Sequence, residues 1–228
     1  MIRTPTTARA SPPPACWVKA AVTGRVIFNA VPPKLDPLRN KPCCPDSPET
    51  LSDESVIVGK DNGLANVFVY LENGPKTDGS SLPAALLDQK YCQYIPHVVG
   101  VVVNQPLTLR SSDPVPHNVK IKPPGEGERN YSMKAAGESE VTQLLRPGFA
   151  TSHCDVHPWM TAVIGVFDNP FFAVTDKNGN FKIENVPDGT YTVIARHERY
   201  LKTPPQTITI AGGKAVSVDF KYEPPAQS

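Results

Sequence analysis

The stretch "FFAVTDKNGNFKIENVPDGTYTVIARH", Phe171 to His197, alternates apolar and polar residues between two glycine-containing turns. Such alternation predicts half-buried β-strands, and glycine supplies the positive φ that tight hairpin turns require. The turns fall at Asn178-Gly179 and Asp188-Gly189, and Gly212-Gly213 divides the next segment, "QTITIAGGKAVSVDFKY", in the same way. This part of the chain is therefore expected to fold as consecutive antiparallel hairpins.

The rest of the chain has the same β character. "GRVIFN" and "ANVFVYLE" alternate as strands do, "HVVGVVVNQPLTLRSSD" indicates two strands around a turn, and "AVIGVF" indicates a buried strand. The 26 prolines among 228 residues forbid long helices. "ESEVTQLL" is compatible with a helix on propensity, but the Arg-Pro-Gly that follows favours a strand. The sequence predicts an all-β protein.

Charge and hydropathy exclude two classes of partner. The 23 Lys and Arg residues balance 22 Asp and Glu residues, and no basic run is present, so no nucleic-acid binding is expected. The longest apolar runs, such as "VVGVVV", are far shorter than the roughly 20 residues that span a bilayer, so no transmembrane segment is expected. No secretory leader is legible in the first 17 residues, which are rich in Pro, Thr and Ala. Residues 1–19 are expected to be a disordered leader, and residues 224–228 a tail.

Five cysteines are an odd number, so at least one does not pair with another cysteine. Cys154 is the candidate for that role. The adjacent Cys43 and Cys44 could bond each other only with strain, which makes Cys92 the natural partner of one of them. Such a disulfide would indicate an oxidising compartment. The alternative is a set of buried, reduced thiols.

The segment "SHCDVHPWM" concentrates potential metal ligands. If Cys154 ends a strand, His157 and Met160 follow at steps of three, and a tight turn could bring a thiolate, an imidazole and a thioether around one ion. His117 in "SDPVPHNV", at the start of a neighbouring predicted strand, offers a fourth ligand. Two histidines and a cysteine with a weak axial methionine form the ligand set of a type 1 copper site.

Other interpretations of these residues remain open. A single histidine or methionine in isolation is more often a packing residue than a ligand. Zinc accepts Cys and His but gains little from a thioether, and the paired spacings typical of structural zinc sites are missing. A nucleophilic Cys-His pair would leave Met160 without a role. The four residues taken together favour copper.

"SDPVPHNV" and "CDVHPWM" resemble the two copper-binding segments of the cupredoxin family, which includes plastocyanin and amicyanin. The short Cys-x-x-His-x-x-Met loop is most similar to that of amicyanin. The resemblance implies an antiparallel Greek-key β-sandwich that transfers single electrons. It implies His117, Cys154, His157 and Met160 as copper ligands, with Asn118 tying the two ligand loops together. The glycine usual at one turn of the family is replaced here by Asn104-Gln105.

A wider resemblance covers most of the chain. "DESVIVGKDNGLANVFVYLE" and "FFAVTDKNGNFKIENVPDGTY", together with the copper segments, are similar to exported bacterial proteins, common in planctomycetes, that join a cupredoxin to a carboxypeptidase-regulatory-like β-domain. That resemblance implies export to the periplasm or beyond and the Cys92 disulfide to Cys43 or Cys44. It also suggests that residues 20–75 and 168–223 form one smaller, prealbumin-like β-sandwich, with a cupredoxin of residues 76–167 inserted between them. A sequential arrangement is the alternative.

The expected function is one-electron transfer without substrate turnover, so no enzyme activity is expected. The partner would be a cytochrome or a copper or haem oxidoreductase that docks transiently, with electrons passing through an exposed edge of His157. Trp159 would either shield the site from water or belong to the docking surface. The alternative function is copper delivery, or a structural cell-surface β-module without electron transfer.

The three remaining histidines are less informative. His153 is expected to point away from the metal because side chains alternate along a strand. His97 could be a second ligand near the copper, or a structural or surface residue. His197 is expected on the surface of a strand in the second domain.

Overall fold

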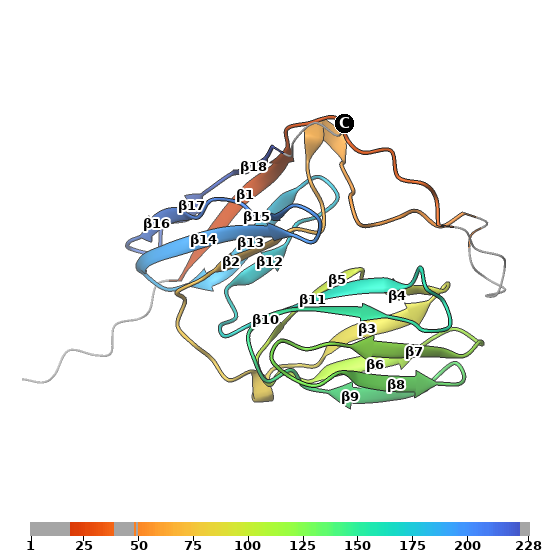
Figure 1. Ribbon diagram of the computed structural model, residues 1–228. Helices are drawn as coiled ribbons and strands as arrows, with labels where there is room; N and C mark the ends of the chain where they lie inside the picture. The colour runs from red at the N-terminus through yellow and green to blue at the C-terminus, as the bar shows by residue number, and fades with distance from the viewer. Residues whose placement is uncertain (1–18, 39–47, 49, 224–228) are drawn as a thin grey trace, which may run out of the picture.

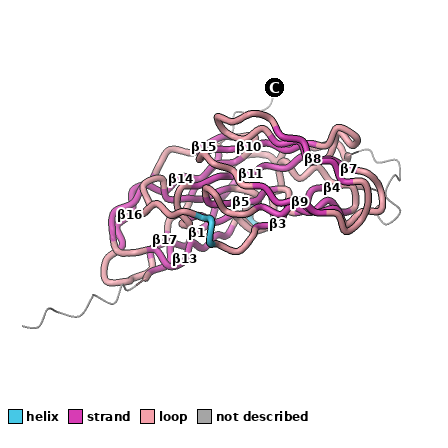
Figure 2. Tube along the Cα trace, turned by 90° about the horizontal axis from the view of Figure 1, so that it is seen from below, coloured by secondary structure: helices cyan, strands magenta, loops and turns pink. Residues whose placement is uncertain are grey.

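The computed structural model of the protein describes residues 19–38, 48 and 50–223. The expected leader up to residue 18, the tail 224–228, and both Cys43 and Cys44 lie outside the described residues. The described chain consists almost entirely of strands and loops (Figure 2). Its helical elements are two short 3-10 turns, η1 (Lys60–Asn62) and η2 (Gly79–Ser81). No helix in these described ranges is both long enough and apolar enough to cross a membrane.

The middle of the chain forms one β-sandwich, here called the central sandwich (Figure 1, yellow to cyan). Its first sheet has the strand order β4-β3-β6-β9, with β3 (Ala85–Lys90), β4 (Gln93–Ile95), β6 (Leu107–Ser111) and β9 (Ser139–Thr142). Its second sheet has the order β5-β11-β10-β7-β8, with β5 (Val98–Val102), β7 (His117–Ile121), β8 (Arg129–Met133), β10 (Gly148–His153) and β11 (Thr161–Phe167). The segment "ESEVTQLL" contains strand β9, as its flanking Arg-Pro-Gly favoured.

The two ends of the described chain form a second unit, the terminal sandwich (Figure 1, red-orange and blue). One sheet has β1 (Ala20–Phe28) between β13 (Asn180–Val186) and both β17 (Val216–Ser217) and β18 (Phe220–Tyr222). The other has the order β12-β2-β14-β15, and β16 also pairs with β14; these strands are β2 (Phe68–Leu71), β12 (Phe172–Val174), β14 (Gly189–His197), β15 (Leu201–Lys202) and β16 (Gln206–Ile210). Early and late segments therefore share both of its sheets.

A tight turn that contains a glycine leads into strand β13. Gly179 (φ 78°) turns the chain into β13, and the side chain of Asp176 accepts hydrogen bonds from the main-chain N–H groups of Asn178 and Asn180. These contacts fix the turn locally, as short polar side chains do in Asx turns. The "DKNGN" segment is thus a structural turn.

Aromatic rings fill the contact between the two sandwiches. Phe68 of β2 and Phe167 of β11 lie 5.6 Å apart between ring centroids, and Phe172 of β12 stacks on Phe167 at 4.4 Å. Gly100 makes room for this packing, because a Cβ at that position would lie 2.3 Å from the Phe172 ring. Apolar burial of this kind holds the two sandwiches together.

Candidate metal centre

Strand pairing brings the two predicted ligand segments together. β10 ends at His153, so Cys154 is the first residue of the loop to β11. β7 begins at His117 and runs antiparallel to β10, with Ser152 opposite Ile121. The start of β7 therefore lies beside the loop that follows β10, as the metal-site hypothesis requires.

Three of the four predicted ligands converge. Nδ1 of His117 lies 2.9 Å from Nδ1 of His157, and Sγ of Cys154 lies 3.9 Å from the same His157 nitrogen. All three residues are buried, with exposed fractions of 2%, 6% and 1% for His117, His157 and Cys154. The side chains form a compact group of two imidazoles and one free thiol.

Met160 closes the loop that carries these groups. Its main-chain N–H donates to the carbonyl of His157 (2.8 Å), and its carbonyl accepts from the N–H of Cys154 (3.2 Å). The Met160 side chain is buried in the same apolar cluster as Cys154. The loop thus places the thioether in the apolar core of the central sandwich, to which Cys154 also belongs.

The ionisation of these groups suits a thiolate ligand. Burial acts to raise the pKa of Cys154, but hydrogen bonds from His117 and from the N–H groups of Asn118 and His157 outweigh it and lower the pKa. Burial acts to lower the pKa of His117, but hydrogen bonds to Asp113 and Cys154 raise it to about 9. Burial and the charge of His117 lower the pKa of His157. In the metal-free protein His117 therefore carries a proton that a metal ion must displace.

Asp113 fixes the orientation of His117, a role that the sequence interpretation missed. Its Oδ2 accepts from Nε2 of His117 (2.9 Å) and from the main-chain N–H of Cys92 (2.8 Å), while Oδ1 accepts from the N–H of Tyr91 (2.7 Å). A carboxylate on Nε2 keeps a hydrogen on that nitrogen, so Nδ1 is the nitrogen that can bind a metal once its own proton is displaced. The sequence does contain a signal for this role, because the carboxylate of Asp113 precedes the candidate ligand His117 by four residues.

Asn118 connects the two ligand segments. Its Oδ1 accepts from the main-chain N–H of Asp155 (2.7 Å) and from the Cys154 thiol (3.3 Å). Its Nδ2 donates to Asn130 (2.8 Å) and to the carboxylate of Asp155 (3.0 Å). Asn118 thus contacts both segments, with Asp155 and Asn130 as partners that the sequence did not indicate, and its role at a metal site stays a prediction.

Cys92 lies against the same group. Its sulfur and ligand atoms of His117 and His157 all lie within 4.8 Å of one another. Cys92 is disulfide-bonded, however, and a disulfide sulfur offers no thiolate. We therefore assign the thiolate position to the free Cys154 and not to Cys92. The expected partners of Cys92, Cys43 and Cys44, lie outside the described residues, so the pairing stays a prediction.

Trp159 packs against His157. Its ring centroid is 5.2 Å from that of His157, and its Nε1 donates to the carbonyl of Cys92 (3.1 Å). The indole is half-buried, and both roles expected of it, shielding the site from water and docking a partner, stay predictions. The expected exposed edge of His157 is wrong, because that side chain is buried. Trp159 and Met160 also line a pocket of about 280 Å³ with Tyr94, Glu54 and His97.

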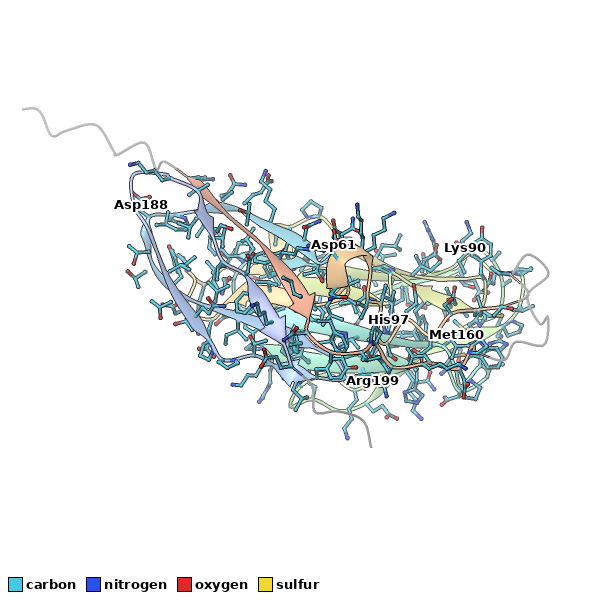
Figure 3. All side chains as sticks on the ribbon, turned by 90° about the horizontal axis from the view of Figure 1, so that it is seen from above. Asp61, Lys90, His97, Met160, Asp188 and Arg199 are labelled. Carbon is cyan, nitrogen blue, oxygen red and sulfur yellow. The ribbon has the colours of Figure 1, made fainter. Side chains whose placement is uncertain are left out.

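The other histidines have separate roles. His153 points outward, with 46% of its side chain exposed. His97, close to Met160 in Figure 3, joins the two sandwiches: Nε2 bonds Glu198 at 2.7 Å, and Nδ1 lies 3.1 Å from the carbonyl oxygen of Thr161. The prediction that His197 lies on the surface is wrong. It is fully buried, because Tyr200 stacks on its ring and Tyr222 packs against its edge.

Fold and site define an all-β protein of two sandwiches, with a buried Cys/His group that could hold a metal ion. The model of the carboxypeptidase regulatory-like domain family matches residues 158–223. No curated protein matches the chain.

Solved structures similar to this one include amicyanin, a purple cupredoxin and a copper-containing nitrite reductase. A methionine-to-alanine mutant of amicyanin in its Cu(I) form is 19% identical, covers 43% of this chain and 97% of its own, and has a TM-score of 0.34. A purple cupredoxin from Nitrosopumilus maritimus is 18% identical over 36% of this chain and 98% of its own, with a TM-score of 0.32. A copper-containing nitrite reductase from Thermus scotoductus is 16% identical over 38% of this chain and 23% of its own, with a TM-score of 0.33.

Proposed function

We propose that the protein is a mononuclear type 1 copper protein that carries single electrons between redox partners in an exported compartment. The observation that carries this proposal is the convergence of His117 Nδ1 and His157 Nδ1, 2.9 Å apart, beside the free thiol of Cys154. Met160, buried in the same loop, supplies a thioether. One thiolate, two imidazoles and one thioether suit copper better than zinc or a hard cation.

The residues around the site fit this group. Hydrogen bonds lower the pKa of Cys154, which favours its thiolate form, and Asp113 orients His117. A bound copper ion would supply the one-electron change between Cu(I) and Cu(II). Asn118 and the main-chain bonds of Met160 hold the ligand side chains in place by contacts that do not involve the ion. A site held in this way changes little when the charge of the ion changes, which favours rapid electron transfer.

Electron transfer requires a route out of the buried site. We propose that it passes through His157 and the adjacent ring of Trp159, which is the more exposed of the two. The partner would be a cytochrome or a copper or haem oxidoreductase, bound weakly over this loop. The disulfide at Cys92 supports a periplasmic or otherwise oxidising location.

We propose a carrier and not an enzyme. A catalytic copper would need further histidines, and within the described residues His97 is bonded to Glu198 while Nδ1 of His197 accepts from the N–H of Arg199. His153 is exposed and lies near Asp155. Within the described residues, His117 and His157 are the two histidines whose ring nitrogens lie together beside a free cysteine.

Two rates measured on the copper-loaded chain test the carrier role. Electron self-exchange, followed by NMR line broadening, should be fast, while transfer of Cu(I) to a copper-free acceptor protein should be slow. We expect slow copper release because the proposed ligands are buried and because the loop that carries three of them is held by its own main-chain hydrogen bonds. Rapid copper handover with negligible electron exchange would overturn the carrier role in favour of copper delivery.

A further inference from the structure

The disulfide-bonded Cys92 lies against the two histidines of the candidate metal centre. Its sulfur is within 4.8 Å of ligand atoms of His117 and His157, and the residue is fully buried in the apolar cluster that also contains Cys154 and Met160. The ligand atoms of a tetrahedral site lie about 3.3–3.8 Å apart for metal–ligand bonds of about 2.0–2.3 Å. The Cys92 sulfur therefore lies no more than about 1 Å beyond such a spacing from a nitrogen of each histidine.

The backbone of Cys92 is held by groups that do not depend on its sulfur. Tyr91 and Cys92 take left-handed φ values of 60° and 53° in the turn between β3 and β4. Both of their N–H groups donate to Asp113, and the Cys92 carbonyl accepts from Trp159. Because none of these hydrogen bonds involves the sulfur, we expect the turn to stay in place when the S–S bond is broken.

We propose that this disulfide is a redox switch that sets the number of thiolate ligands. With the disulfide intact, the site offers the single thiolate of Cys154. After reduction, Cys92 supplies a second thiolate beside His117 and His157, and the site becomes a Cys2His2 group. Such a group favours a tetrahedral ion with no redox chemistry of its own, such as Zn²⁺, over the type 1 copper state. This inference rests on the proposed ligand site.

The chemistry of the switch is thiol–disulfide exchange with a dithiol reductant. One thiolate of the reductant attacks the disulfide, the S–S bond breaks, and one cysteine leaves as a thiolate. The second thiol of the reductant then attacks the mixed disulfide and releases the other cysteine. The protein gains two electrons and two protons, and the reductant becomes a cyclic disulfide.

Cobalt(II) reports the thiolates directly, because each cobalt–thiolate bond adds charge-transfer absorption in the near ultraviolet. The metal-free full chain is prepared with its disulfide intact, or reduced with a dithiol that is then removed anaerobically, and each form is titrated with Co²⁺. The absorption per bound cobalt should roughly double on reduction. In Cys154→Ser it should be absent with the disulfide intact and should appear on reduction.

A double variant tests whether the second thiolate comes from Cys92 or from another cysteine that reduction frees. Cys92→Ser combined with Cys154→Ser keeps every other cysteine of the chain, and its bound cobalt should show no thiolate absorption before or after treatment with the dithiol. Absorption in the reduced double variant would assign the new ligand elsewhere and overturn the inference, as would unchanged absorption in the reduced wild type. The disulfide-intact wild type tests the proposed function separately, because it should already show one thiolate.

Discussion

Asp113 and His117 are joined by a hydrogen bond of 2.9 Å between Oδ2 and Nε2, and the same oxygen accepts from the N–H of Cys92. One carboxylate thus positions a candidate metal ligand and the turn that carries the disulfide. Asp113 itself is almost completely buried, which keeps these bonds away from competing water.

Asp113→Asn is expected to weaken copper binding. The amide removes the charge that favours the Nε2–H form of His117, so Nδ1 is presented less firmly, and losses of about 10–100-fold are typical for such partners. Competition between the protein and a Cu(I) chelator measures the affinity. Asp36→Asn, at an exposed position, is the matched control and should bind as the wild type does. Equal affinity of the two variants would show that Asp113 does not position the ligand.

Asn118→Ala is expected to destabilise the metal-free protein by about 1–3 kcal/mol, because the partly buried N–H of Asp155 and the buried thiol of Cys154 lose their acceptor. Chemical denaturation followed by circular dichroism gives the free energy of unfolding. Asn29→Ala removes only an exposed side-chain contact with Glu223 and should change stability by less than about 0.5 kcal/mol. A similar small effect at both positions would contradict the tying role of Asn118.

Gly100→Ala is expected to weaken the contact between the sandwiches. Its Cβ would lie 2.3 Å from the Phe172 ring, and such overpacking costs about 1–3 kcal/mol. Gly127→Ala is the control, because nothing lies within 4 Å of a Cβ at that position. Urea denaturation should separate the two variants; unchanged stability in Gly100→Ala would mean that Phe172 moves aside at no cost.

His197→Phe is expected to reduce the acid sensitivity of the fold. Burial, then the charges of His97 and Arg199, lower the pKa of His197 from 6.5 to about 4. Between these values the unfolded chain binds a proton that the folded chain does not, so stability falls as pH falls from 6.5 towards 4. The full shift corresponds to roughly 3 kcal/mol.

Denaturation at pH 7 and at pH 4.5 measures this effect. The loss of stability between the two should be smaller in His197→Phe than in the wild type, since phenylalanine keeps the stacking on Tyr200 and does not titrate. His153→Gln, at an exposed position, should retain the wild-type loss. An identical pH dependence in all three proteins would contradict a buried, neutral His197.

Local patterns in the sequence were sufficient to predict the β fold. Alternation and glycine turns identify strands such as β13 and β14, because both signals depend on neighbouring residues. The division into residues 20–75 with 168–223 and an inserted 76–167 stays a prediction. The pairing of β1 with β13 and of β2 with β12 supports it.

Contacts between distant segments were harder to anticipate. Side-chain spacing suggested Cys154, His157 and Met160 as one group because a single loop contains them. Cys92 lies in a separate turn far upstream of that loop, and only the three-dimensional packing brings its sulfur to the histidines. The burial of His197 likewise depends on Tyr200 and Tyr222, whose approach no local pattern records.

The visible spectrum of the purified chain after addition of Cu²⁺ tests the central claim most directly. A single thiolate ligand at Cys154 predicts an intense thiolate-to-copper absorption that disappears reversibly on reduction. That absorption should be missing in Cys154→Ser and retained in His153→Gln, whose side chain points away from the site. A colourless wild-type protein, or an absorption that survives in Cys154→Ser, would contradict the account.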